Sequence, residues 1–195
     1  ASHEIRTPLA LLRTELELAR WPGRTRRQLE HALESAGDET DRLSQLAEDL
    51  LVLAQSDDSR LPLQHEHLSV RNLLADTAQR FQKRAEQAGR TITVDSADLR
   101  LSGDRLRLEQ ALGNLIDNAL RYGAGTVHLS ATIHEDEIEL HVSDAGDGFP
   151  ADFLPCAFER FSRADEARSR GGTGLGLAIV DVIARAHGGT ARAGN

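Results

Sequence analysis

The sequence contains no methionine, a single cysteine, few aromatic residues and no long apolar run. Because Cys156 stands alone, the chain forms no internal disulfide and no cysteine-rich zinc site, and this usage is typical of a reducing compartment. No stretch approaches the roughly 18 consecutive apolar residues that a membrane span needs, and no signal-peptide pattern opens the chain. The missing methionine leads us to expect a fragment of a longer protein.

Length and charge narrow the classes of protein further. The chain has 195 residues, of which 39% are hydrophobic and 28% charged, the usual composition of one large or two small globular domains. Its formal net charge is -8. Nucleic acids and anionic lipids attract clustered positive charge, so we expect no nucleic acid among the main partners.

Residues 1–56 have the apolar spacing of two helices in a bundle. Apolar and small residues alternate at spacings of four and three up to Ala19, Trp21-Pro22-Gly23 is a turn signal, and the alternation resumes from about Arg26. The predicted seam residues are Ile5, Leu9, Leu12, Leu16, Ala19, Leu29, Leu33, Ala36, Thr40, Leu43, Ala47, Leu50 and Ala54. An antiparallel hairpin cannot bury both seams alone, so we expect a homodimer that forms a four-helix bundle.

A histidine and a glutamate open the first of these helices, at His3 and Glu4. His3 falls one position past the seam and Thr7 four residues further on, so both are expected on one outward face. Glu4 can polarise an imidazole N–H, which makes the other ring nitrogen a better nucleophile. Most isolated His-Glu pairs are solvated helix surface. An exposed and activated histidine on a helix is nevertheless well suited to phosphoryl transfer.

After a polar linker at residues 57–62, helical patterns alternate with strands. We expect helices at 69–88 and from about Asp104, and a final apolar helix that opens within 171–177 and closes at Gly188-Gly189. Strands are expected at 91–94, 99–101, 126–133 and 137–143. Residues 63–195 are therefore predicted to form an α/β sandwich, which makes the whole chain α+β in class.

Two polar patterns in this second region need an explanation. Asn114, Asn118 and Arg121 share one face of an otherwise apolar helix, where an amide requires a partner. For either asparagine alone, capping of nearby backbone would be the favoured interpretation. Asp144-Ala145-Gly146-Asp147-Gly148 follows a strand and, taken alone, is an ordinary glycine-containing loop.

A glycine-rich stretch, Gly171-Gly172-Thr173-Gly174-Leu175-Gly176-Leu177, opens the last helix. Backbone N–H groups at such a helix start bind phosphate through their geometry and through the helix dipole. No lysine follows the glycines, so this is not a P-loop, and no strand directly precedes them as a Rossmann turn requires. The segment 149–170 before it contains four of the chain's five phenylalanines and the polar run 162–170, a pattern typical of a mobile lid.

Together these motifs resemble those of the sensor histidine kinases of two-component signalling. Ser2-His3-Glu4-Ile5-Arg6-Thr7-Pro8-Leu9 resembles their phospho-acceptor box, and residues 114–122 resemble their N box. Residues 144–148, 158–161 and 171–177 are similar to the first glycine box, the F box and the second glycine box. The matches follow the family's order over residues 2–189, which implies a phospho-acceptor hairpin followed by a GHKL-type ATP-binding domain.

The resemblance implies an ATP-dependent protein-histidine kinase. His3 would accept the γ-phosphoryl group, with Glu4 and Thr7 as the other catalytic residues, Asn118 would hold Mg²⁺, and Asp144 would accept a hydrogen bond from adenine. The residues that it assigns to ATP binding are Asn114, Asn118, Arg121, Tyr122, Asp144, Gly146, Gly148, Gly172, Thr173, Gly174, Leu175 and Gly176. The phosphoryl group would then pass to an aspartate of a response regulator, and Glu4-x-x-Thr7 resembles the family's phosphatase motif.

The resemblance also bears on the parent protein. We expect a missing N-terminal sensor region that anchors the parent in the cell membrane, with this fragment on the cytoplasmic side. After Gly189 the family usually continues with a further strand or hairpin. We therefore expect the sheet of residues 63–195 to be truncated at its C-terminal end.

Two other functions compete with the kinase. GHKL-type ATPases use nucleotide to drive a conformational clamp, and they carry a glutamate four positions before the Mg²⁺-binding asparagine as base for the attacking water. That position is Asn114 here, and an amide cannot accept the proton. A catalytically inactive dimerisation module is the other alternative, but none of the boxes is missing.

Overall fold

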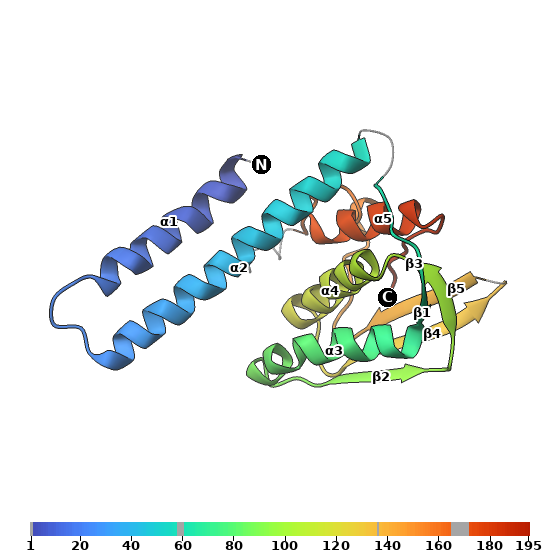
Figure 1. Cartoon of the computed structure of the whole chain (residues 1–195), viewed down its shortest axis with the longest axis horizontal. Helices are drawn as coiled ribbons and strands as arrows, with labels where there is room; N and C mark the ends of the chain where they lie inside the picture. The colour runs from blue at the N-terminus through green and yellow to red at the C-terminus, as the bar shows by residue number, and fades with distance from the viewer. Residues whose placement is uncertain (1, 58–60, 136, 165–171) are drawn as a thin grey trace. The chain divides into compact units, whose positions relative to one another are not determined.

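The computed structural model describes residues 2–57, 61–135, 137–164 and 172–195, and the side chains of residues 2–8, 41, 42 and 57 lie outside that description. The chain divides into two compact units, Ala1–Ala54 and Gln55–Asn195 (Figure 1). None of the helices in the described ranges is both long and apolar enough to cross a membrane.

The first unit is a hairpin of two helices, α1 (Ser2–Ala19) and α2 (Arg26–Asp57), which confirms the expected helix ends near residues 20 and 26 (Figure 1). A capping box starts α2, because the Thr25 hydroxyl accepts from the Gln28 N–H at 3.3 Å and the Gln28 side chain accepts from the Thr25 N–H at 3.0 Å. Across the turn, Arg24 donates to the Leu18 carbonyl at 3.1 Å. α2 ends at Asp57, inside the segment that the sequence assigned to the linker.

The second unit mixes helices and strands as predicted. In chain order its elements are β1 (Glu66–Ser69), α3 (Val70–Gln87), β2 (Ile92–Ser96), β3 (Arg100–Gly103), α4 (Arg105–Tyr122), β4 (Val127–His134), β5 (Glu137–Ser143), the 3-10 turn η1 (Leu154–Cys156) and α5 (Gly176–Ala186). β2 and β4 are parallel and β4 and β5 antiparallel in one sheet, with Leu129 opposite Val94 and Val142, while β1 and β3 form a separate antiparallel pair.

β1 is the strand that the sequence did not predict. It has four residues, of which only Leu68 is buried, so it shows no alternation of apolar and polar positions. It forms because it pairs with β3, where Leu68 lies opposite Leu101. Its last residue, Ser69, then caps α3 by accepting a hydrogen bond from the Asn72 N–H.

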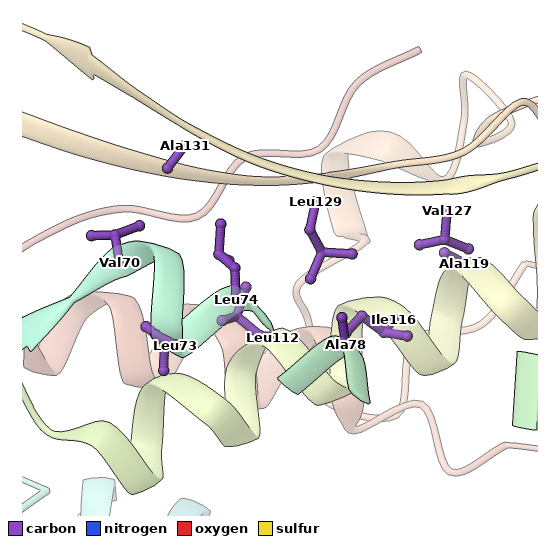
Figure 2. Close-up of a cluster of buried hydrophobic side chains, with 10 residues drawn as sticks. All are labelled: Val70, Leu73, Leu74, Ala78, Leu112, Ile116, Ala119, Val127, Leu129 and Ala131. Atoms are coloured by element: carbon purple, nitrogen blue, oxygen red, sulfur yellow. The ribbon is translucent and has the colours of Figure 1, made fainter. Parts of the chain in front are cut away.

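The core of this unit lies between α3, α4 and one face of the three-stranded sheet (Figure 2). Its fully or largely buried side chains are Val70, Leu73, Leu74 and Ala78 from α3, Leu112, Ile116 and Ala119 from α4, and Val127, Leu129 and Ala131 from β4. The opposite face of the sheet is polar, with His128 bonded to Thr93 and His141 to Thr132. A helical region followed by an α/β unit is therefore confirmed, while the four-helix bundle stays a prediction.

Candidate functional site

The site is organised around α4, which is fixed at its start by Asp104. The Asp104 carboxylate accepts hydrogen bonds from the Arg107 N–H at 3.1 Å and, across the unit, from the Gln64 N–H at 2.8 Å. Burial would raise the pKa of Asp104, but these hydrogen bonds and the charge of Arg107 outweigh it and hold that pKa below its ordinary value. The Asp104 N–H donates to Nε2 of His187 at the end of α5, so the last helix is tied to the same point.

Asn114 and Asn118 lie half-buried on α4, on the side away from the core residues Leu112 and Ile116. The Asn114 side-chain amide donates to the carbonyl of Gly176, the first residue of α5, at 3.3 Å. This backbone contact is the alternative that the sequence left open for a lone asparagine. Asn114 thus sets α5 against α4, while Asn118 lies one turn further toward the end of α4.

The glycine-rich loop contacts the C-terminal end of α4. A Cβ added at Gly172 would lie 2.8 Å from the Tyr122 hydroxyl oxygen and 3.6 Å from Nη1 of Arg121. The structure therefore brings together residues that are about 50 positions apart in the chain and that the sequence assigned to one phosphate site. Gly171 belongs to the same predicted box and lies outside the described residues.

The start of α5 is ordered by the loop itself. The Thr173 hydroxyl accepts from the Leu175 N–H at 3.3 Å, and the Leu175 side chain is completely buried. Gly174 has a φ of +68° and packs against backbone, because a Cβ there would come within 2.8 Å of the Phe161 carbonyl carbon. The Phe161 N–H donates to the Gly174 carbonyl at 2.8 Å, so the segment similar to the F box is joined to the glycine loop.

Arg121 is oriented by an acidic residue that the sequence reasoning missed. Its guanidinium donates to Oδ2 of Asp117 at 3.1 Å, and Nη2 of Arg84 on α3 lies 2.5 Å from Oδ1 of the same carboxylate. Asp117 is half-buried between the two cations. The available signal was the i,i+4 spacing of Asp117 and Arg121, which is common on helix surfaces and therefore weak.

Asp144 follows β5 and is exposed. Its Oδ1 accepts from the Gly146 N–H at 2.7 Å and from the Ala124 N–H at 3.2 Å, which fixes the carboxylate across the loop after α4. Both of these hydrogen bonds go to Oδ1, so Oδ2 is the oxygen they leave to an incoming donor. Gly148, with a φ of +76°, lies against the side chain of Asn195, which bonds both the N–H and the carbonyl of Phe149.

The donor set can bind an anion and a hard cation. No group of three or more His, Cys, Asp or Glu side chains among the described residues could enclose a metal ion. An amide oxygen on Asn118 nevertheless fits Mg²⁺, because this ion keeps several waters and takes its remaining ligands from phosphate oxygens. Arg121, Tyr122 and the backbone N–H groups before α5 are the groups nearby that suit phosphate.

His3, Glu4 and Thr7 belong to the other compact unit. All three lie in α1, as the sequence predicted, and their side chains are among those outside the description. Within the second unit, the structure assembles the candidate nucleotide site from α4, α5 and two loops.

Family models match both units of the chain. Residues 1–59 match the His Kinase A (phospho-acceptor) domain, and residues 103–195 match the histidine kinase-, DNA gyrase B-, and HSP90-like ATPase. The chain belongs to the sensor histidine kinase family. The resemblance that the motifs suggested is thereby confirmed.

Individual sensor histidine kinases are similar to this chain over almost its whole length. It is 37% identical over 194 residues to a probable sensor histidine kinase, TcrY, of Mycobacterium tuberculosis, covering 97% of this chain and 41% of that protein. Among solved structures it is similar to the Acinetobacter baumannii histidine kinase AdeS, with a TM-score of 0.73, 29% identity and coverage of 94% of this chain and 86% of that one.

A second similar structure is that of full-length ShkA in complex with AMPPNP, with a TM-score of 0.71, 30% identity and coverage of 96% of this chain and 40% of that one. The chain spans about two fifths of the length of the curated relative TcrY, because the match covers 41% of that protein.

Proposed function

We propose that this chain is the catalytic part of an ATP-dependent protein-histidine kinase, which transfers the γ-phosphoryl group of Mg-ATP to His3 and then to an aspartate of a response regulator. The observation that carries the proposal is the meeting of the N-box helix α4 with the glycine loop, where Gly172 lies against Tyr122 and Arg121. The similar structure of ShkA holds AMPPNP, an ATP analogue, which supports ATP as the ligand.

In this proposal the base and the phosphates bind at the two ends of the site. Oδ2 of Asp144 accepts the hydrogen bond from the adenine amino group, and Gly146 and Gly148 let the backbone pass close to the ring. The phosphates bind the loop of Gly172, Thr173, Gly174, Leu175 and Gly176, together with Arg121 and Tyr122. Asn114 supports that loop through its bond to Gly176.

Asn118 is the residue that would hold Mg²⁺, through its side-chain carbonyl oxygen. When bound, the ion would supply positive charge that offsets the negative charge of the triphosphate. The protein's own contribution is an uncharged side-chain oxygen that lies one helical turn before Tyr122 and Arg121. These are the two residues of α4 proposed to bind the phosphates.

At the acceptor, a ring nitrogen of His3 attacks the γ-phosphorus. An N–P bond forms as the bond to the β,γ-bridging oxygen breaks, and the electron pair leaves with ADP. Glu4 stabilises the N–H on the other ring nitrogen as positive charge develops on the imidazole. The product is a phosphoramidate, whose phosphoryl group the receiver aspartate then takes. We further propose that Thr7 takes part in the reverse function, hydrolysis of the phosphorylated regulator.

A second copy of the chain is the partner that we propose for the hairpin. Several predicted seam residues are exposed in the single chain, including Leu33 at 64%, Leu9 at 49% and Leu16 at 46%. Leucines at a bundle seam are stabilising only when they are buried, at about 25 cal/mol for each Å² of apolar surface. A four-helix bundle of two hairpins would cover them. We also propose that a longer parent carries an N-terminal sensor region anchored in the membrane, with this part on the cytoplasmic side.

The test is incubation of the chain with γ-labelled ATP and Mg²⁺, followed by candidate receiver domains. We expect acid-labile label on the protein, located at His3 by mass spectrometry and lost in His3→Gln. His31→Gln, on the exposed surface of α2, is the matched control and should incorporate label normally. Release of phosphate without labelled protein would favour the clamp ATPase instead, and normal labelling of His3→Gln would refute the acceptor assignment.

A further inference from the structure

Arg90 occupies a backbone position that is fixed from both sides. α3 ends in a Schellman motif, in which Gly89 has a φ of +66° and donates to the Glu86 carbonyl at 3.0 Å while the Arg90 N–H donates to the Ala85 carbonyl at 2.8 Å. The next residue, Thr91, is bonded to β4, because its carbonyl accepts from the Val127 N–H at 2.9 Å. The backbone from which the Arg90 side chain extends is therefore held in place by hydrogen bonds on both sides.

The guanidinium of Arg90 donates to three backbone carbonyls at the end of α4. Nη1 binds the Ala119 carbonyl at 2.5 Å, Nη2 the Ala124 carbonyl at 2.7 Å and Nε the Gly125 carbonyl at 2.7 Å. A planar cation with a rigid set of donors is suited to this geometry, and its charge lies at the negative end of the helix dipole. Arg90 thus fixes the loop 123–125 to the last turn of α4.

The same loop holds Asp144. The Ala124 N–H donates to Oδ1 of Asp144, and the Ala124 carbonyl accepts from the Ala145 N–H at 2.9 Å as well as from Arg90. The carboxylate also packs against the Cα of Gly123. One peptide segment therefore connects the Arg90 guanidinium to the carboxylate that is exposed to solvent.

We infer that Arg90 is a positioning residue for nucleotide recognition: by clamping the loop 123–125 it orients Asp144 toward the 6-amino group of adenine. This inference rests on the proposed function, because it takes Asp144 as the adenine acceptor. Arg90 itself does not touch the nucleotide or the reacting atoms. It affects the selectivity for the base and the affinity for the nucleotide. The rate of phosphoryl transfer at saturating ATP does not depend on it.

The experiment compares two nucleotides on the whole chain by titration calorimetry. ATP carries the 6-amino group, and purine riboside triphosphate lacks it, so the ratio of their dissociation constants measures the Asp144 contact. The variants are Arg90→Met, Arg90→Lys, Asp144→Asn and the double variant Arg90→Met/Asp144→Asn. The matched control is Arg80→Met, an α3 arginine that binds Glu109 on α4 at 2.9 Å, far along the helix from the loop.

We expect Arg90→Met to weaken ATP binding about tenfold, because the charge-assisted hydrogen bond of Asp144 to the adenine amino group is then partly lost. Binding of purine riboside triphosphate should be unchanged, so the preference for ATP falls. Arg90→Lys keeps the charge without the three-way fork and should recover little of the preference. In the Asp144→Asn background, Arg90→Met should add almost nothing.

Each result bears on the inference or on the proposed function separately. If Asp144→Asn leaves the preference for ATP unchanged, the adenine assignment is wrong. If Asp144→Asn lowers the preference but Arg90→Met and Arg90→Lys do not, Arg90 is a structural helix cap and the inference fails. The inference also fails if Arg90→Met weakens the binding of both nucleotides equally. It fails as well if the effect of Arg90→Met on ATP binding is additive with that of Asp144→Asn. Thermal unfolding of each variant verifies that it is folded at the titration temperature.

Discussion

The carboxylate of Asp144 lies directly on the Cα of Gly123, the residue that follows α4, and a Cβ added there would collide with Oδ1 and Cγ. We therefore expect Gly123→Ala to displace the carboxylate and weaken ATP binding about tenfold to a hundredfold, the value of a lost charge-assisted hydrogen bond. Titration calorimetry with ATP measures the change.

The control for this substitution is Gly194→Ala, because nothing lies within 4 Å of an added Cβ at that position. It should bind ATP as the unchanged chain does. If Gly123→Ala and Asp144→Asn differ widely in their effect on ATP affinity, the contact between the two residues is not what orients the base.

The helices of this chain could be predicted from the sequence because each repeats the same apolar spacing over many residues. α2 and α4 are clear cases: one carries an alternation of four and three, and the other buries Leu112, Ile116 and Ala119 at that spacing. The glycine loop and the Asp144 loop were found for a different reason, since each is a short motif of adjacent residues.

The contacts that orient those motifs could not be predicted. Arg90 reaches carbonyls 29 to 35 residues away, and Ala124 reaches Asp144 across 20 residues, so no short pattern contains both partners. Gly123 is small because a carboxylate packs on it, a requirement that appears only when the two loops meet. β1 was missed because its stability comes from pairing with β3 and not from its own residues.

Asn118 is the candidate Mg²⁺ ligand, and Asn118→Asp changes its amide to a carboxylate of nearly the same shape. We expect autophosphorylation to be lost, because a negative charge then lies beside the triphosphate and alters the balance of charge around the ion. Label incorporation from γ-labelled ATP measures the effect. Asn72→Asp, on the exposed first turn of α3, introduces the same charge away from the site and should leave labelling intact. Normal labelling of Asn118→Asp would refute the ligand assignment.

Asp104 links α4 to the segment before β1, and its folded-state pKa lies below the ordinary value near 3.9. A depressed carboxyl pKa contributes stability that is fully present above about pH 4 and is lost as the pH falls through the folded pKa. We expect Asp104→Asn, which cannot accept from both Arg107 and Gln64 as a carboxylate does, to lower the free energy of unfolding by about 1 to 2 kcal/mol at neutral pH.

Denaturant unfolding at a series of pH values tests this linkage. The stabilities of the unchanged chain and of Asp104→Asn should converge as the pH falls from about 4 through the lower folded-state pKa, where the native carboxylate becomes protonated. Asp98→Asn, an exposed aspartate of the same unit, is the control and should run parallel to the unchanged chain. A difference that stays constant down to low pH would mean that the charge of Asp104 contributes nothing.

Thr7 lies one helical turn beyond His3 in α1, so a phospho-aspartate docked over the histidine would bring its phosphate close to the Thr7 hydroxyl, which can orient a water for in-line attack. In the proposed mechanism, phosphoryl transfer to His3 does not use this hydroxyl. We therefore expect Thr7→Ala to keep most autophosphorylation and to slow the loss of phosphate from the regulator. The control is Thr14→Ala, because the Thr14 hydroxyl donates to the Ala10 carbonyl of the same helix, at 2.9 Å. If autophosphorylation and dephosphorylation of the regulator both fall in Thr7→Ala, Thr7 has a structural role. If neither changes, Thr7 takes no part in either reaction.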